Sequence, residues 1–109
     1  MDFVKGAGAN GTSYQGDIAA DYATLVRLFG PPDFGPDDRW GDKVTCEWCL
    51  RWADGMITTI YDYKTERTPR GLYAWHIGGR NKLAAERIRD YLQINLDPLV
   101  RMVKDHEGV

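Results

Sequence analysis

The residues of this chain that are best suited to binding chemistry lie between a predicted strand and a predicted helix. Residues 75–82 read Trp-His-Ile-Gly-Gly-Arg-Asn-Lys, which indicates a strand that turns through two glycines into a helix. The first turn of a helix carries unpaired backbone N–H groups and the positive end of the helix dipole, so it attracts anions. The sequence therefore predicts a ligand or anion site, whose candidate residues are His76, Gly78, Gly79, Arg80 and Lys82.

The same residues also have a purely structural interpretation, which the sequence leaves open. The glycines would then only form the turn, and the basic side chains would be solvated. His76 alternates with Trp75 and Ile77, so it points to the more polar face of the strand. A histidine there either makes ordinary hydrogen bonds or contacts a phosphate or carboxylate, because histidine changes charge near neutral pH.

Two charged loops form the second candidate site. Residues 31–42 are rich in proline and aspartate, whereas residues 64–71 are polar and basic. Loops of opposite charge suit docking onto a protein with complementary charges. The candidate partner-binding residues are Asp33, Asp37, Asp38, Asp42, Lys64, Arg67 and Arg70.

Catalytic motifs are missing from the sequence. It contains no phosphate-binding glycine loop, no H-E-x-x-H and no nucleophile, histidine and acid at a suggestive spacing. A hydrolase or nuclease would need His76 to meet Asp62 or Glu47 on the more polar face of the sheet. We therefore predict a protein that is not an enzyme, with no catalytic residue and no cofactor.

The two cysteines, Cys46 and Cys49, form a C-x-x-C pair within an alternating, strand-like run. Residues three apart on a strand point to opposite faces and lie about 10 Å apart. That separation is too large for a disulfide or for a shared zinc ion. We predict two free thiols, with Cys46 inward and Cys49 outward, and no metal site.

Hydrophobic periodicity predicts the elements that position these residues. Apolar residues at positions 22, 25, 26 and 29 form one stripe of a helix between Asp21, a good N-cap, and Gly30. Asp54-Gly55 predicts a two-residue turn between strands over 43–52 and 56–63, a register in which Trp48 opposes Tyr61. Further strands are predicted over 12–18 and 72–77, and helices from residue 81 and over 97–103. The expected core is Leu25, Phe29, Trp48, Leu50, Trp52, Ile57, Tyr61, Trp75, Ile77, Ile88 and Leu92.

This order of elements predicts an α+β fold. An antiparallel sheet in β-α-β-β-β-α order would carry the helices packed on its apolar face. Residues 1–11, rich in glycine and alanine, are expected to form a flexible or irregular lead-in, and residues 12–109 a single domain.

Composition is typical of a folded protein outside the membrane. The chain has 109 residues, of which 43% are hydrophobic and 12% aromatic, and a formal net charge of −2, which excludes intrinsic disorder. No window approaches the ~18 consecutive apolar residues of a membrane-spanning helix. The first residues do not resemble a secretory signal either. We expect a cytoplasmic location and no membrane partner.

Nucleic acid is disfavoured as a partner because the isoelectric point is about 5.6. Tyr61, Tyr63 and Tyr73 could stack on bases, but the predicted register places them on the core face. The opposite face, which carries Cys49 and Ile60, is mixed in polarity and offers a surface for a homodimer.

A combined pattern in the chain resembles a set of small proteins encoded by tailed bacteriophages. It comprises the strings Gly-Thr-Ser-Tyr-Gln-Gly at 11–16, Phe-Gly-Pro-Pro at 29–32, Glu-Trp at 47–48, Ile-Tyr-Asp-Tyr-Lys at 60–64 and Trp-His-Ile-Gly-Gly at 75–79. The resemblance implies a protein made during infection, in the host cytoplasm, and assigns no site residue. Phage proteins of this size often bind and block a host factor, including components of bacterial defence.

Two functional hypotheses follow. The first is a binding protein that blocks a host protein, such as an anti-defence inhibitor, through its charged loops. The second is a binder that sequesters a nucleotide or cyclic-nucleotide signal at the Gly78-Gly79 helix start.

Overall fold

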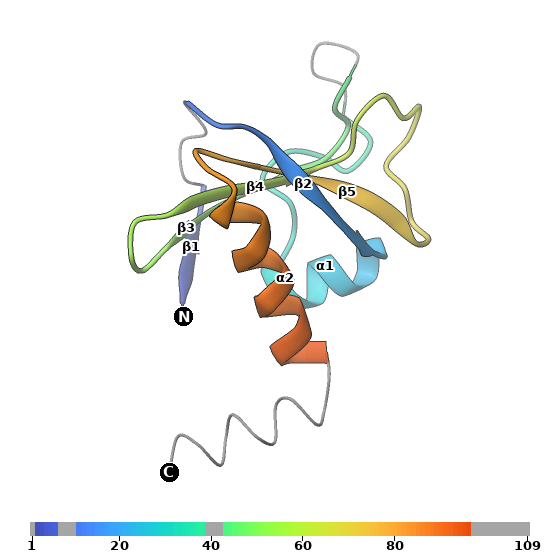
Figure 1. Ribbon diagram of the computed structural model, residues 1–109. Helices are drawn as coiled ribbons and strands as arrows, with labels where there is room; N and C mark the ends of the chain where they lie inside the picture. The colour runs from blue at the N-terminus through green and yellow to red at the C-terminus, as the bar shows by residue number, and fades with distance from the viewer. Residues whose placement is uncertain (1, 7–10, 39–42, 97–109) are drawn as a thin grey trace.

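The computed structural model describes residues 2–6, 11–38 and 43–96. Five strands and two helices are present in this part of the chain: β1 (Phe3–Lys5), β2 (Ser13–Ala20), α1 (Tyr22–Phe29), β3 (Glu47–Trp52), β4 (Ile57–Tyr61), β5 (Tyr73–Gly79) and α2 (Leu83–Leu96). The strands form one sheet in the order β1-β3-β4-β5-β2, and every neighbouring pair is antiparallel. Both helices lie on the same side of the sheet (Figure 1). The predicted α+β class is confirmed.

Helix α1 begins and ends where the sequence predicts. The Asp21 carboxylate accepts a hydrogen bond from the Thr24 N–H at 2.8 Å, which caps the N-terminus. The Gly30 N–H donates to Val26 O at 2.8 Å, and Gly30 takes a φ of 79°, which favours glycine. Leu25 and Phe29 are buried against the sheet side of the helix.

The core lies between the sheet and the helices and is built around three tryptophans. Trp48 and Trp75 pack edge to face with ring centroids 5.5 Å apart, and both are fully buried. Each indole N–H is paired, since Trp48 donates to Gly30 O and Trp75 donates to Ala20 O, both at 2.9 Å. Trp52 donates in the same way to Thr58 Oγ1 at 3.0 Å. Because these hydrogen bonds pair the indole N–H groups, the three rings are buried without leaving an unpaired donor in the core.

The hairpin between β3 and β4 has a longer turn than the sequence predicts. The Trp52 N–H donates to Met56 O at 2.8 Å, so three residues rather than two connect the strands. Gly55, the last of the three, takes a φ of 91°. A three-residue loop that ends in a left-handed glycine is the next most common hairpin after the two-residue type.

This extra turn residue corrects the predicted register by one position. Trp48 pairs with Ile60, and Glu47 pairs with Tyr61. A one-residue shift moves every side chain of one strand to the other face. Ile60 is therefore fully buried in the core, whereas Ile57 and Tyr61, which were predicted to be core residues, are only half-buried.

The predicted irregular lead-in is also corrected, because residues 3–5 form the edge strand β1. Phe3 pairs with Trp52, and its ring lies 5.2 Å from Trp52, 5.6 Å from Phe29 and 5.8 Å from Tyr91. Three residues are too short a stretch to show alternation in the sequence. Tertiary contacts with aromatic side chains therefore define this strand.

Strand β5 continues through the two glycines that were predicted to end it, and α2 begins only at Leu83. In α2, the expected core residues Ile88 and Leu92 are buried together with Ala84 and Ala85. Neither described helix has the length and apolarity needed to cross a lipid bilayer. The further helix predicted over 97–103 lies outside the described residues.

Candidate functional site

The side of the sheet that faces away from both helices, here called the open face, carries a row of polar and aromatic residues. Strand pairing aligns Glu47 with Tyr61, Tyr61 with His76, and His76 with Asp17. The row thus crosses four strands, with a carboxylate at each end and two aromatic rings between them. Because paired residues share a face, these four side chains project on the same side.

A bulge in β2 adds a third ring. Gly16 pairs with Ile77, but Tyr14 pairs with Gly78, so one extra residue lies between them. An extra residue reverses the alternation of the strand. Gly16 therefore faces α2, where an added Cβ would lie 3.2 Å from Ala85, whereas Tyr14 faces outward, with its ring 5.2 Å from that of His76.

Tyr14, Tyr61, Tyr63 and His76 together line a hollow of about 540 Å³ on the open face, which we call the tyrosine–histidine hollow. All three tyrosine rings contact the His76 imidazole. The Tyr61 ring stacks on it at 5.4 Å with a 28° interplanar angle, and the Tyr63 ring lies 5.5 Å away at 51°. Tyr14 and Tyr63 are exposed by 55% and 37%, which is high for rings on a sheet face.

The hollow contains a polar atom without a partner. His76 Nδ1 is buried and makes no hydrogen bond to the described residues. Buried polar atoms are nearly always paired in folded proteins, so His76 Nδ1 stands out among the described residues. Gly78 packs against the neighbouring strand on the same face, because a Cβ there would lie 2.3 Å from Thr59 Oγ1 and 3.5 Å from the Tyr61 ring.

The electrostatic surroundings of Tyr61 are acidic. Burial raises the pKa of its hydroxyl, and the neighbouring groups Glu47, Tyr14, Tyr63 and Asp17 raise it further. The pKa of Tyr14 is raised chiefly by its hydrogen bond to the Asp17 side chain. Both tyrosines therefore stay protonated at neutral pH. The Tyr61 hydroxyl can donate a hydrogen bond to a ligand, whereas the Tyr14 hydroxyl donates to Asp17.

Glu47, the carboxylate at the β3 end of the row, is half-buried. Burial raises the pKa of its carboxyl, the Cys49 thiol at 3.7 Å lowers it, and Asp33 raises it again. Within the described part of the chain, no Lys, Arg or His lies within ion-pair distance of Glu47. A partly buried carboxylate is thus left without a counter-charge.

The structure does not assemble the predicted anion site. His76 lies in the tyrosine–histidine hollow on the open face, whereas Gly79 lies under α2, where an added Cβ would be 2.2 Å from Ala84. Arg80 lines a different hollow, of about 350 Å³, beside the β3–β4 turn. Lys82 is exposed just before α2. Gly78 and Gly79 are needed for close packing on both faces of β5.

The start of α2 is already partly capped. The Leu83 N–H donates to Asn81 Oδ1 at 2.9 Å, and the Ala84 N–H donates to Asn81 O at 3.1 Å. The hollow beside it is also lined by Asp54, whose carboxylate pairs with the Arg87 guanidinium at 2.6 Å. Two of the amide groups that an anion would use therefore have partners within the chain.

The two charged loops contact each other instead of forming separate docking surfaces. The Asp37 carboxylate accepts hydrogen bonds from the Arg70 guanidinium and from the Thr68 N–H, both at 2.9 Å. Both contacts lower the pKa of Asp37, the Thr68 N–H more strongly. The loops therefore neutralise part of each other's charge, and their partner-binding residues are partly used within the fold.

The other loop candidates are dispersed. Asp33 accepts from the Cys49 N–H at 2.7 Å and lies 3.9 Å from the Lys5 ammonium. Asp38 accepts from the Gly35 N–H at 3.2 Å. Arg67 is exposed, and the Lys64 ammonium lies 5.4 Å from the centre of the Tyr63 ring. Asp42 lies outside the described residues.

The acids proposed for a hydrolase do not meet His76. Asp62 is fully buried and accepts hydrogen bonds from the Thr45 N–H and hydroxyl, the Cys46 N–H and the Thr65 hydroxyl. Glu47 lies two strands away from His76, about 10 Å across the sheet. The carboxylate next to His76 is Asp17, which no sequence motif indicated.

The cysteines are both free and buried, so Cys49, predicted to point outward, is covered. Burial raises the pKa of each thiol to about 12, which makes both poor nucleophiles. No cluster of three metal-ligating side chains is found among residues 2–6, 11–38 and 43–96.

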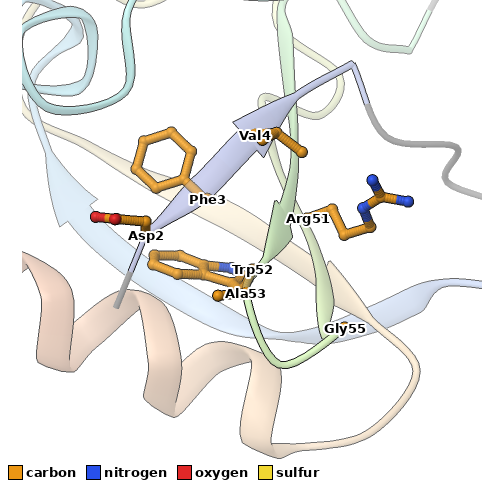
Figure 2. A pocket seen from close by; sticks show the side chains of 7 residues that line it. All are labelled: Asp2, Phe3, Val4, Arg51, Trp52, Ala53 and Gly55. Carbon is orange, nitrogen blue, oxygen red and sulfur yellow. The ribbon is translucent and has the colours of Figure 1, made fainter.

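A further hollow, of about 410 Å³, lies at the outer edge of the sheet, between β1 and the end of β3. Figure 2 shows Arg51 pointing away from Phe3 and Trp52, so the residues around this hollow project to different sides of the sheet edge. Phe3 and Trp52 belong to the core packing. This hollow therefore lacks the convergent polar groups that distinguish a binding site.

Comparison of the chain with protein-family models, with curated proteins and with solved structures gave no match.

Proposed function

We propose that this protein is a binding protein that recognises another protein through the open face of its sheet, with the tyrosine–histidine hollow at the centre of the contact. The observation that carries the proposal is the exposure of Tyr14 and Tyr63 around that hollow. Tyrosine is enriched among the residues that contribute most to protein–protein binding, since its ring is large and rigid and its hydroxyl forms hydrogen bonds.

The packing of the fold supports this choice of surface. The aromatic residues on the helix side are used by the core, and the charged loops are tied together through Asp37 and Arg70. The open face keeps three tyrosines and a histidine beside a hollow. The resemblance to phage proteins extends the proposal: the partner is a host factor, and binding blocks it, as an anti-defence inhibitor does.

The test compares the wild-type chain with a double variant, Tyr14→Ala with Tyr63→Ala, in capture from a bacterial lysate. Both side chains are exposed, so the variant should keep the stability of the wild type in urea denaturation. Leu83→Ala is the matched control, because Leu83 is similarly exposed but lies on α2, on the other side of the sheet.

We expect one specific protein that binds the wild type and Leu83→Ala and is lost with the double variant. The captured protein, once purified, should lose activity when the wild type is added. Capture that the double variant retains, or the absence of any specific protein, would refute the proposal.

A further inference from the structure

We propose that the tyrosine–histidine hollow binds the guanidinium group of an arginine side chain presented by the partner protein. The inference rests on the proposed function and names the chemistry of contact at the same surface. Tyr14, Tyr61 and Tyr63 provide the ring faces, and Glu47 and Asp17 provide the negative charge at the two ends of the row.

The arrangement of rings suits a flat cation. Three tyrosine rings surround one imidazole at centroid distances of 5.2–5.5 Å and are inclined to it by 28–54°. The faces of such rings are negative, so they attract cations placed above them. A guanidinium is planar and weakly hydrated, and it stacks on aromatic rings more readily than an ammonium does.

One ring of the hollow already contacts a cation. The Lys64 ammonium lies 5.4 Å from the centre of the Tyr63 ring. Elsewhere in the chain, the Arg70 guanidinium lies 4.4 Å from the Tyr22 ring, which is the closest of the cation–ring contacts described. Lys64 therefore demonstrates that the Tyr63 ring is accessible to a positive charge, and it competes with an incoming arginine for that ring.

Charge complementarity favours a cation over a phosphate-bearing ligand. Glu47 is half-buried, and no described basic side chain lies within ion-pair distance of it. At the other end of the row, the Arg89 guanidinium donates to the Asp17 carbonyl at 3.1 Å and leaves the carboxylate to Tyr14. An arginine seated between the rings supplies the missing counter-charge to Glu47, whereas a phosphate there would face repulsion.

The experiment titrates the folded protein with N-acetyl-arginine amide and follows the ring resonances of His76 and Tyr14 by NMR. N-acetyl-citrulline amide is the neutral probe of the same shape, and AMP is the probe for a stacked nucleobase. Asp54→Asn is the control variant, because it removes an exposed carboxylate that lies outside the hollow.

We expect saturable shifts with the arginine compound at millimolar concentration and none with citrulline. Glu47→Gln should weaken binding about fivefold, as loss of one charge contact of about 1 kcal/mol implies. Lys64→Asn should tighten it, because it removes the competing cation. Asparagine also tolerates the φ of 57° at this position. Asp54→Asn should bind like the wild type.

Equal shifts with citrulline, no shift with any probe, or shifts with AMP that the arginine compound does not displace would overturn the inference. The two proposals fail separately. If the captured protein depends on Tyr14 and Tyr63 but N-acetyl-arginine amide neither binds nor competes with it, the protein-binding function stands and the arginine contact is wrong. If neither the capture nor the arginine titration gives the expected result, both proposals are wrong, because they share this surface.

Discussion

Replacing Gly79 by alanine tests whether the glycine pair is structural. A Cβ at Gly79 would lie 2.2 Å from the Ala84 Cβ on α2, while the next atoms, at 3.5 and 3.6 Å, are at ordinary contact distance. One methyl–methyl clash therefore accounts for the whole obstruction, and either strand β5 or helix α2 must move to relieve it. Gly71 is the matched control, because a Cβ there meets nothing within 4 Å.

The size of the effect follows from overpacking. Inserting a methyl group into a tightly packed contact costs about 1–3 kcal/mol, so Gly79→Ala should lower the free energy of unfolding by about 2 kcal/mol. Ala84→Gly alone should cost about 1 kcal/mol, since glycine is disfavoured in a helix. The double variant removes one clashing methyl, so it should lose only about 1 kcal/mol.

Urea denaturation of the wild type, the two single variants, the double variant and Gly71→Ala measures these free energies in one series. Non-additivity of about 2 kcal/mol between Gly79→Ala and Ala84→Gly is the expected result. An additive double variant, or a Gly79→Ala as stable as Gly71→Ala, would refute the packing argument. Either outcome would make the glycine pair a candidate anion site at the start of α2 again.

Three further outcomes are expected. Asp62→Ala should lower the free energy of unfolding by about 3–5 kcal/mol in urea denaturation, because it leaves four donors without their acceptor and unpaired buried donors cost about 1–3 kcal/mol each. A loss below 1 kcal/mol would contradict this role. Burial raises the pKa of Cys46 and Cys49 from 9.0 to about 12. Both thiols should therefore react with Ellman's reagent at pH 8 about a thousandfold more slowly in the folded than in the urea-unfolded protein. Comparable rates would show that the thiols are accessible. Arg87 lowers the pKa of Asp54 to about 2, so the stability difference between the wild type and Asp54→Asn should be full above about pH 4 and vanish towards pH 2; a difference that persists at pH 2 would have another origin.

Local periodicity predicted the fold class because the features that define it are local. The cap at Asp21, the glycine at position 30 and the apolar stripe of α1 all lie within ten residues. The core tryptophans were also predicted, since alternation along one strand needs no knowledge of its neighbour. Strand β1 could not be predicted, because its three residues are held by aromatic rings from distant parts of the chain.

The candidate site was harder to predict, because it depends on register. An Asp-Gly pair fits a two-residue or a three-residue turn, and the choice decides whether Tyr61 faces the core or the open face. His76 was correctly placed on the side away from Trp75, but its neighbours come from other strands. The pair Tyr61 and Tyr63 at alternate positions before Lys64 was the one available indication of an exposed aromatic surface.

The bulge in β2 determines which side chain of this strand lies on the open face, and it does not involve the core tryptophans. If β2 paired without the bulge, Gln15 would lie opposite Gly78 and the Tyr14 ring would turn towards α2, while the pairing of residues 16–20 with β5 stayed as it is. Loss of the bulge in this peripheral strand therefore exchanges Tyr14 for Gln15 on the open face with no change in chain length. A lineage under pressure to follow a changing target could alter its specificity there while its tryptophan interior stays constant.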